Sequence, residues 1–357
     1  MLEECRWLYN NTLAYRKDAW EQEQRNAGWY ETKRRIPVLK ADRPSLTTVH
    51  SMVLQNVTER VELAFQAFFR RLKAGAAPGY PRFRGVGRYN SLTYPQYGNG
   101  AQLSGASLYL SKVGPVAVLL HRSPEGTPKT VTITRSSTGK WYVSFSCEWE
   151  PTALPLVEPV VGIDVGLTTF ATLSDGSTIA NPRFFRRDER ALAQVQRAHS
   201  KLEKGTPRRR RHRKAVARVH ERIQWRRQDH AHQHSRRLIN SHQVIAVEDL
   251  AVNRLVHNHC LAKSISDAAW AEFSSFLSYK AAWAGRTFVA VNPAYTSQDC
   301  HVCGHRQKMP LAERVYNCPC CGLSCDRDHN AALNILARGL ASIGSQSIAA
   351  PAFTPGE

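Results

Sequence analysis

A short apolar segment, residues 160–166, reads VVGIDVG. A run of this length and composition predicts a β-strand that the fold buries. It nevertheless carries a carboxylate, Asp164, among apolar neighbours. The arrangement recurs at residues 244–248, which read VIAVE and end in Glu248. A third acid, Asp328, stands where an apolar helical pattern begins.

Each of these acids alone has an ordinary explanation as a turn or cap residue. Three of them, two on apolar strands, favour a pocket for divalent cations, because hard carboxylate oxygens suit Mg²⁺ or Mn²⁺. Two such ions can activate a water and stabilise the leaving oxygen of a phosphodiester. The residue pattern leaves both explanations open, local caps or metal ligands.

A cluster of cysteines points to a second metal. Cys300 and Cys303 form one Cys-x2-Cys pair, Cys318 and Cys321 form another, and a glycine directly follows each pair. Each pair can present two thiolates to one ion, and two pairs complete a tetrahedral Zn²⁺ site without an open position. We therefore expect a structural zinc ribbon. Cys320 lies inside the second pair, but the spacing favours Cys318 with Cys321.

The charge of the chain is concentrated in one segment. The 357 residues carry a net charge of +20, and residues 183–237 contribute +14 of it, from 19 basic and five acidic side chains. Apolar residues at helical spacing flank a Gly-Thr-Pro break at 205–207, which predicts two basic helices. Solvated helix faces are often charged, but here the acids are too few to pair the bases. We expect a polyanionic partner contacted by Arg208, Arg209, Arg210, Arg211, Arg213 and Lys214.

The rest of the chain divides by its pattern. Residues 1–75 show apolar stripes at helical spacing and begin inside a helix, so the N-terminus looks truncated. Residues 76–155 alternate short β-rich runs with turn residues, which predicts a small barrel or sandwich. An α/β pattern covers 156–297, the cysteine pairs fall in 298–323, a last helix is expected at 324–340, and 341–357 are expected as a disordered tail. No segment approaches the ~20 apolar residues of a membrane span and no signal peptide opens the chain, so we expect a cytoplasmic protein.

Four motifs occur in an order that is typical of one family. They are GIDVG at 162–166, VEDL at 247–250, YTSQ at 295–298 with the cysteine pairs, and DRDHNAA at 326–332. With them the chain resembles the TnpB family, the transposon-encoded, RNA-guided nucleases of IS200/IS605-type elements, which are related to the Cas12 effectors. The resemblance implies a multi-domain α/β protein. Its RNase H-like RuvC nuclease core would carry a zinc-ribbon insertion and follow a helical recognition lobe and a β-barrel wedge domain.

The resemblance also implies an activity. Matched by motif, Asp164, Glu248 and Asp328 take the catalytic RuvC positions, with Mg²⁺ or Mn²⁺ as cofactor. The implied partners are a guide RNA transcribed from the transposon end and a double-stranded target DNA with a short flanking motif, in a monomeric ribonucleoprotein at the nucleoid. Contacts to the flanking motif are expected at Gln55, Tyr89, Asn90, Ser91 and Thr93, although an exposed helix and a turn explain these residues equally well.

Other functions remain open at this level. A guided DNA-binding repressor would be expected to have lost acids, and all three remain. An accessory protein could regulate transposition by binding DNA alone. A strand-transferring transposase is disfavoured, because no Tyr with a paired His signature is found. Family members also begin with an additional strand of the wedge barrel ahead of the match at residues 4–10.

Overall fold

The computed structural model describes residues 1–310 and 312–348. The chain forms two compact units, Met1–Glu150 and Pro151–Glu357. Within the described ranges, no helix is long and apolar enough to cross a membrane. Each unit has its own hydrophobic core, so each is described separately.

The first unit begins with helices that share one apolar core. The longest, α4 (Ser51–Lys73), buries a stripe that includes Val53, Val57, Val61 and Phe65. It ends at Lys73, and Gly75 follows the C-cap residue Ala74 with a φ of +74°, which suits a residue without a Cβ. The other elements here are α1 (Leu2–Glu23), α2 (Trp29–Arg34), α3 (Ile36–Asp42) and the 3₁₀ helix η1 (Pro44–Thr48).

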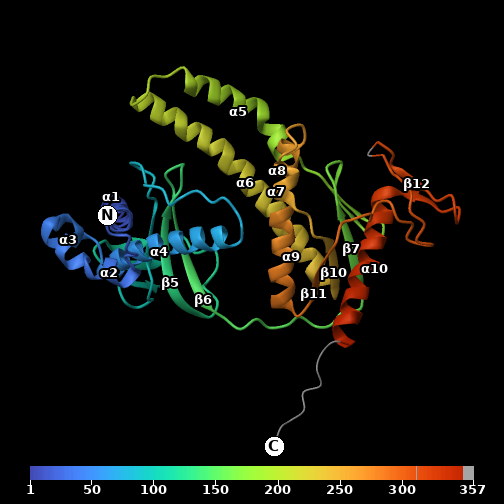
Figure 1. Cartoon of the computed structure of the whole chain (residues 1–357), viewed down its shortest axis with the longest axis horizontal. Helices are drawn as coiled ribbons and strands as arrows, with labels where there is room; N and C mark the ends of the chain where they lie inside the picture. The colour runs from blue at the N-terminus through green and yellow to red at the C-terminus, as the bar shows by residue number, and fades with distance from the viewer. Residues whose placement is uncertain (311, 349–357) are drawn as a thin grey trace, which may run out of the picture. The chain divides into compact units, whose positions relative to one another are not determined.

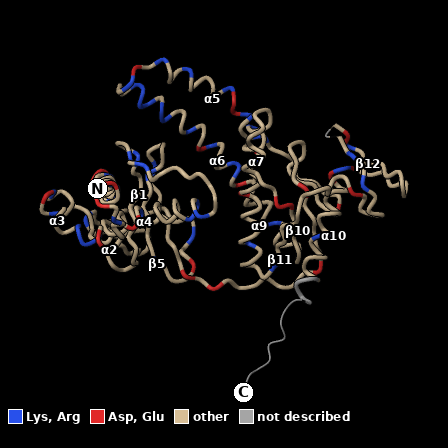
Figure 2. Tube along the Cα trace, viewed as in Figure 1, with Lys and Arg blue, Asp and Glu red and all other residues tan. Residues whose placement is uncertain are grey.

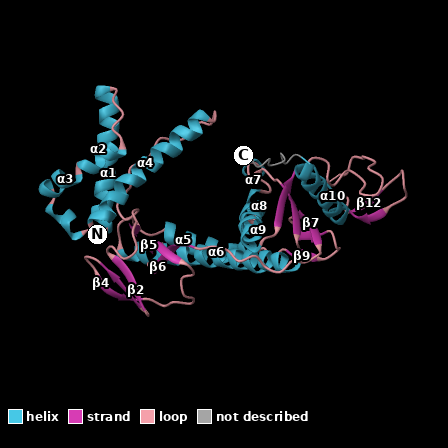
Figure 3. Ribbon diagram, turned by 90° about the horizontal axis from the view of Figure 1, so that it is seen from below, coloured by secondary structure: helices cyan, strands magenta, loops and turns pink. Residues whose placement is uncertain are grey.

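The strands of the first unit form two antiparallel sheets. The residue pattern of 76–155 predicted a small barrel or sandwich, and the family resemblance implied a β-barrel. No sheet closes on itself in the part of this unit that the structure describes. One sheet has the order β1-β5-β6 and the other the order β2-β3-β4. Figure 3 labels β5 and β6 of the first sheet and β2 and β4 of the second. The strands are β1 (Ser91–Tyr94), β2 (Ala101–Ser104), β3 (Ser107–Leu110), β4 (Gly114–Ala117), β5 (Thr127–Arg135) and β6 (Trp141–Glu148).

One face of the first sheet belongs to the core of the unit. Tyr94 of β1 and Val131 of β5 are fully buried in the same core as Leu8 of α1 and Leu54 of α4. The same core includes Leu108 and Leu110 of β3, so the helices and the second sheet both contribute to it. In addition, β1 has only four residues and is followed by Pro95, which cannot donate a ladder hydrogen bond.

A mixed five-stranded sheet forms the centre of the second unit. Its order is β11-β10-β7-β8-β9. The strands β11, β10 and β7 are parallel, whereas β7, β8 and β9 form an antiparallel meander. The bounds are β7 (Val160–Val165), β8 (Thr169–Leu173), β9 (Thr178–Ala180), β10 (Val244–Glu248) and β11 (Thr287–Val291).

Helices cover both faces of this sheet (Figure 1). On one face, α6 (Pro207–Ser241) and α9 (Trp270–Ala284) pack against Ile245 and Val247. On the other face, α10 (Arg327–Ile348) packs against Ala246 and Val291. Successive side chains of a strand point to opposite faces, so β10 contributes to both layers.

Two glycines allow α10 to approach the sheet closely. A Cβ on Gly162 of β7 would lie 2.2 Å from the carbonyl oxygen of Ala332. A Cβ on Gly339 of α10 would lie 2.6 Å from the Cβ of Ala246. Backbone meets backbone at the first of these positions, so a side chain there would push α10 away. The close fit fixes where the first turn of α10 lies relative to the strand ends.

The two basic helices form an antiparallel hairpin. They are α5 (Phe184–Ser200) and α6, and Figure 2 shows Lys and Arg along both. The expected break at 205–207 is present: the Thr206 hydroxyl accepts a hydrogen bond from the Arg209 amide at 3.2 Å. Asp188 of α5 joins the helices, because it pairs with Arg222 at 3.0 Å and Arg226 at 3.3 Å.

The C-terminal boundaries differ from those expected. Residues 324–326 form strand β13 (Ser324–Asp326), so the last helix begins at Arg327. It continues to Ile348, and residues 341–348 are therefore helical and not part of a disordered tail. Small residues there resemble a tail in composition, but the first proline that could stop the helix is Pro351. The rest of the expected tail, residues 349–357, lies outside the described residues.

The remaining elements are α7 (Val252–Leu255), α8 (Ala262–Ala268) and β12 (Val315–Asn317).

Candidate metal centres

Two of the three predicted acids occupy equivalent places on neighbouring strands. Ile163 of β7 is in register with Val247 of the parallel strand β10, and Asp164 and Glu248 are the next residues of each strand. Adjacent strands lie about 4.8 Å apart. Asp164 has the same parity as Gly162, which contacts α10. Both acids therefore belong to the sheet face that α10 covers.

The third acid, Asp328, lies in the first turn of α10. Asp326 caps this helix, because its carboxylate accepts hydrogen bonds from the backbone amides of Asp328 at 2.9 Å and His329 at 3.0 Å. The Asp328 carboxylate pairs with Arg327 at 3.1 Å and with Arg314 at 3.5 Å. Arg314 also donates to the Thr168 hydroxyl at 3.2 Å, so an arginine from between the cysteine pairs reaches this acid.

The acids act on one another electrostatically. The pKa of Asp164 is raised well above its usual range, first by burial and then by the negative charges of Glu248 and Asp328, which Arg327 partly offsets. The pKa of Glu248 is also raised by burial, while a hydrogen bond from Thr296 and the charge of Arg338 lower it. Crowded, partly buried carboxylates of this kind are stabilised by a cation.

The donor set fits a hard divalent cation. All three side chains offer carboxylate oxygens, the ligands that Mg²⁺ and Mn²⁺ prefer. They are not a ready-made coordination shell, however. We compared His, Cys, Asp and Glu side chains over residues 1–310 and 312–348. The only group of three or more whose possible ligand atoms all lie close together is formed by four cysteines. Asp328 is instead turned toward Arg314 and Arg327, whose guanidinium groups supply positive charge in this structure.

The four predicted cysteines come together as one cluster. The sulfur atoms of Cys300, Cys303, Cys318 and Cys321 all lie within 4.8 Å of one another. The Cys300–Cys321 and Cys303–Cys318 sulfur distances are 3.6 Å and 3.5 Å. Tetrahedral Zn²⁺ with bonds of about 2.3 Å would hold its sulfurs about 3.8 Å apart, so the cluster fits this ion. Cys320 is exposed and outside the group.

Two similar turns shape this cluster. The Gly304 amide donates to the Cys300 carbonyl at 2.9 Å, and the Gly322 amide donates to the Cys318 carbonyl at 3.0 Å. Both glycines have positive φ, +73° and +75°. A side chain would be strained at either position, which accounts for the glycine after each pair.

The predicted basic contacts are not all equivalent. Arg208, Arg211, Arg213 and Lys214 have exposed side chains near the start of α6. Arg210 is exposed too, and it donates to the Gly205 carbonyl at 3.2 Å. Arg209 is half-buried and donates to the Leu202 carbonyl. Arg209 therefore helps to hold the break between the helices.

Most of the residues expected to contact a flanking motif surround one arginine. Arg60 of α4 donates to the Tyr89 hydroxyl at 3.2 Å, the Ser91 hydroxyl at 3.0 Å and the Thr93 hydroxyl at 2.6 Å. Tyr89 is buried. Asn90 is exposed, and the carbonyl of Gln55 accepts from the Thr58 hydroxyl at 2.7 Å. The side-chain hydroxyls of Tyr89, Ser91 and Thr93 thus serve internal contacts with Arg60.

Several polar residues around the acids were not predicted. The Thr296 hydroxyl donates to Glu248 at 2.5 Å, and Arg338 of α10 pairs with Asp299 at 3.0 Å. Asn334 donates to the Thr296 carbonyl at 2.8 Å. The YTSQ motif contains Thr296, but nothing in the sequence links it to an acid 48 residues earlier.

Comparisons with known proteins show the family to which the chain belongs. The IS605 OrfB family model, described as "Probable transposase", matches residues 144–259, and the "Cas12f1-like, TNB domain" model matches residues 270–335. A Streptomyces pristinaespiralis protein described as a candidate RNA-guided DNA endonuclease is 40% identical, over 94% of this chain and 84% of that protein. The chain belongs to the TnpB family.

A second relative and a solved structure are also similar to this TnpB-family chain. InsQ of Escherichia coli K12, also described as a candidate RNA-guided DNA endonuclease, is 30% identical over 94% of this chain and 86% of InsQ. The Cas12f1 chain in a complex with its guide RNA and target DNA has a TM-score of 0.56 and 15% identity, and the match covers 93% of this chain and 80% of Cas12f1. The second match shows a shared multi-domain α/β fold.

Proposed function

We propose that this TnpB-family chain is an RNA-guided DNA endonuclease that cuts DNA complementary to its guide beside a short flanking motif. One observation carries the proposal: Asp164 and Glu248 end neighbouring parallel strands on the face that α10 covers, and Asp328 lies in the first turn of α10. The three acids are up to 164 residues apart in sequence, and the charges of Glu248 and Asp328 help to raise the pKa of Asp164. The names of the Streptomyces and E. coli relatives support the activity, and the Cas12f1 complex supports RNA and DNA as partners.

In the proposed site the carboxylates would bind metal ions and the arginines would contact phosphate. Asp164, Glu248 and Asp328 would hold Mg²⁺ or Mn²⁺, which supplies water activation and charge neutralisation at a phosphodiester. The chain itself brings the three carboxylates together from two strand ends and one helix start. Arg314 and Arg327 already lie beside Asp328 and are placed to receive a phosphate oxygen when that acid turns to a cation.

We assign the parts of the chain on the same basis. The meander β7-β8-β9 continued by parallel β10 and β11 supports an RNase H-like, RuvC-type core over residues 156–297. Residues 298–323 would be the zinc ribbon and 324–340 would return the chain to the core. Residues 1–75 and 76–155 would serve as recognition lobe and wedge, in a monomeric ribonucleoprotein that acts on DNA in the cytoplasm.

The competing function is a DNA-binding regulator of transposition that does not cut. It would share the basic hairpin and the guide RNA. It has no need for three carboxylates held close enough to raise the pKa of Asp164, and that arrangement opposes the binding of phosphate. A cleavage function explains why three close carboxylates are present although they repel phosphate.

Cleavage by the wild-type protein tests the proposal directly. The chain is expressed with the RNA from its own transposon end and given a DNA duplex that matches the guide. We expect cutting in Mg²⁺ or Mn²⁺, and none in excess chelator. A duplex without the matching sequence is the control. If guided binding occurs but no divalent ion supports cutting, the regulator is the correct function.

The exposed arginine and lysine side chains of α6 should make nucleic-acid binding depend strongly on salt concentration. Each phosphate contact contributes a slope of about −0.7 to −0.9 to log affinity against log salt. Neutralising Arg208, Arg211 and Arg213 with glutamine should therefore reduce the slope by about 2 to 3. The slope is measured by titrating the purified protein with its RNA at several salt concentrations.

A matched control lies further along the same helix. Arg222→Gln with Arg226→Gln removes two charges that Asp188 already pairs. These side chains release fewer counterions, so their loss should change the slope by less per charge. An equal change per charge in both variants would show that net charge, and not contact at the start of α6, governs binding.

A further inference from the structure

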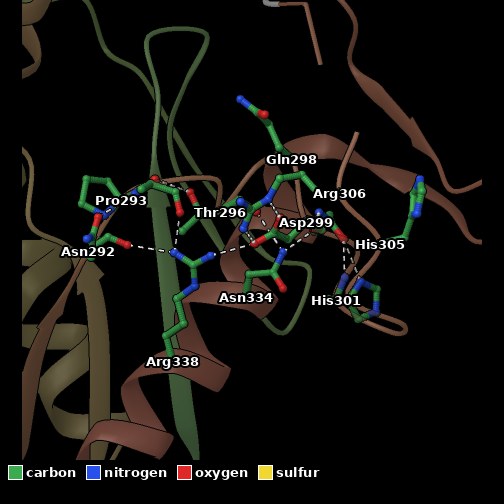
Figure 4. A network of polar contacts seen from close by, with 12 residues as sticks. Asn292, Pro293, Thr296, Gln298, Asp299, His301, His305, Arg306, Asn334 and Arg338 are labelled. Carbon is green, nitrogen blue, oxygen red and sulfur yellow. Dashed lines mark hydrogen bonds and ion pairs between the residues drawn. The ribbon is translucent and has the colours of Figure 1, made fainter. Parts of the chain in front are cut away.

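The segment that joins β11 to the cysteine cluster, residues 292–299, lies against α10 and is called the strap below (Figure 4). Arg338 of α10 donates to the carbonyl oxygens of Asn292 at 3.0 Å and Ala294 at 2.7 Å. The same guanidinium pairs with the Asp299 carboxylate at 3.0 Å. One arginine thus holds both ends of the strap.

Two asparagines on the same helix complete the attachment. Asn334, one turn before Arg338, donates to the carbonyls of Thr296 at 2.8 Å and Asp299 at 2.7 Å. Asn330, another turn earlier, donates to the Asp299 carbonyl at 2.8 Å. Its side-chain oxygen accepts from the His301 amide at 3.1 Å, inside the first cysteine pair. The spacing of four residues aligns the three side chains on one face of α10.

The strap is also held from the side of the cysteine cluster. Arg306 donates to the Asp299 carboxylate at 2.6 Å and 3.1 Å, and its guanidinium lies 3.8 Å from the centre of the Tyr295 ring. Tyr295 has a φ of +67°, a conformation that costs free energy in a residue with a side chain. The surrounding contacts thus impose a strained turn immediately before Thr296.

That turn presents a hydroxyl to Glu248. Thr296 is 3% exposed, and its Oγ1 lies 2.5 Å from Glu248 Oε1 and 3.1 Å from the Pro293 carbonyl. A threonine hydroxyl has one proton to donate. With Glu248 ionised, the shorter contact to the carboxylate takes that proton, since charge-assisted hydrogen bonds are shorter and stronger than neutral ones.

We propose that Thr296 is a positioning residue for Glu248, and that the strap relays the order of the cysteine cluster to that carboxylate. This inference rests on the proposed function, in which Glu248 is a metal ligand. A role in packing alone needs only the contact to Pro293. It does not explain why α10 and Arg306 together hold a strained turn that aims the hydroxyl at a carboxylate.

The test replaces the hydroxyl with a methyl group of similar size. Thr296→Val should raise the Mg²⁺ concentration for half-maximal cleavage about 10- to 100-fold, the usual effect of losing an outer-shell partner. Guided DNA binding measured in chelator should stay within about twofold, because it rests on base pairing. Thr296→Ser keeps the hydroxyl and should restore the Mg²⁺ requirement to within about threefold of the wild type.

A threonine in the other unit gives a matched control. Thr58 is 1% exposed, and its hydroxyl donates to the backbone carbonyl of Gln55 at 2.7 Å. Thr58→Val should leave the Mg²⁺ requirement unchanged. If Thr296→Val fails to fold, Asn334→Ala carries the test, because it releases the strap but keeps the hydroxyl. We expect it to raise the Mg²⁺ requirement too. Where Thr296→Val does fold, the double variant should show less than the sum of the two single effects, because both act on the same contact.

A second readout separates this inference from the proposed function. Mn²⁺ binding, measured by electron paramagnetic resonance on the intact protein, needs no cleavage and should weaken about 10- to 100-fold in Thr296→Val. Absence of cleavage in the wild type would refute the proposed function, while Mn²⁺ binding would still decide the role of Thr296. Wild-type Mg²⁺ and Mn²⁺ dependence in Thr296→Val, or a serine variant as impaired as the valine variant, would overturn the inference.

Discussion

Replacement of Asp164 by asparagine should reduce cleavage about 10³-fold or more. The substitution keeps the size of the side chain but removes one of three charges that would hold the cations. A cation at a phosphodiester contributes several kcal/mol to the transition state, and each 1.4 kcal/mol is a factor of ten in rate. Cleavage is followed on a matched duplex, with guided binding measured in parallel. Binding should be unchanged or slightly tighter, because a carboxylate that repels phosphate is lost.

The same variant should be more stable than the wild type when divalent ions are removed. The pKa of Asp164 in the fold is raised above its usual value near 4, so the folded state binds the proton more tightly than the unfolded chain does. Stability from this group is present at low pH and is lost as pH rises through the raised pKa. The gain from Asp164→Asn should therefore be larger at pH 8 than at pH 4.

Thermal unfolding in chelator checks this second effect. Each kcal/mol corresponds to about 2–4 °C for a unit of 150–250 residues. Added Mg²⁺ should raise the melting temperature of the wild type more than that of the variant, since ions that bind only the folded state stabilise it. Equal cleavage by wild type and variant would show that Asp164 is not part of the site. A variant that melts lower in chelator at every pH would show that the Asp164 charge is already balanced.

The sequence predicts the elements of the second unit well, for a physical reason. Residues 160–165 and 244–248 are apolar runs short enough to be strands, and only a strand buried on both faces needs such a run. The acids at their ends stand out against that background. Which strand lies beside which depends on crossovers through α6 and α9, and residue patterns do not give this. Resemblance to a family was needed to place Asp328 beside the other two acids.

Other features depend on contacts that have no local signature. Tyr94 and Val131 share one buried core with residues of α1, α4 and β3, and strand patterns cannot show which elements meet there. Asn330, Asn334 and Arg338 look like an exposed polar face of a helix in the sequence, yet they hold the strap. Thr296 is one of many threonines until the fold places it 2.5 Å from Glu248.

Substitution of a cysteine in the cluster should have the largest effect on folding of the second unit. We expect one Zn²⁺ per chain, and Cys318→Ser should reduce the zinc content to near zero. Structural zinc sites supply apparent binding free energies of about 10–16 kcal/mol to small domains, so the segment from Cys300 to Cys321 should unfold without the ion. Elemental analysis of protein purified without chelator measures the zinc, and limited proteolysis reports the unfolding.

The position of the cluster in the chain extends this effect to catalysis. Asp328 follows Cys321 by only seven residues, and Arg314, which pairs with Asp328, lies between the two cysteine pairs. The strap enters the cluster at Cys300. Loss of zinc should therefore abolish cleavage, although four thiolates leave the ion no open position for chemistry. Guided binding should suffer less, because the basic helices α5 and α6 lie outside the segment from Cys300 to Cys321.

Cys320 provides the matched control for this experiment. It lies between two ligands, is exposed, and is absent from the group of closely spaced sulfurs. Cys320→Ser should retain one zinc per chain, resist proteolysis and cut DNA as the wild type does. Full zinc content in Cys318→Ser would contradict the assignment of the ligands, and zinc-free wild-type protein that still cuts would contradict any structural role. A zinc-free Cys318→Ser variant that cuts normally would show that Asp328 and the strap hold their positions without the metal, because α10 alone fixes them through its close contact with Gly162.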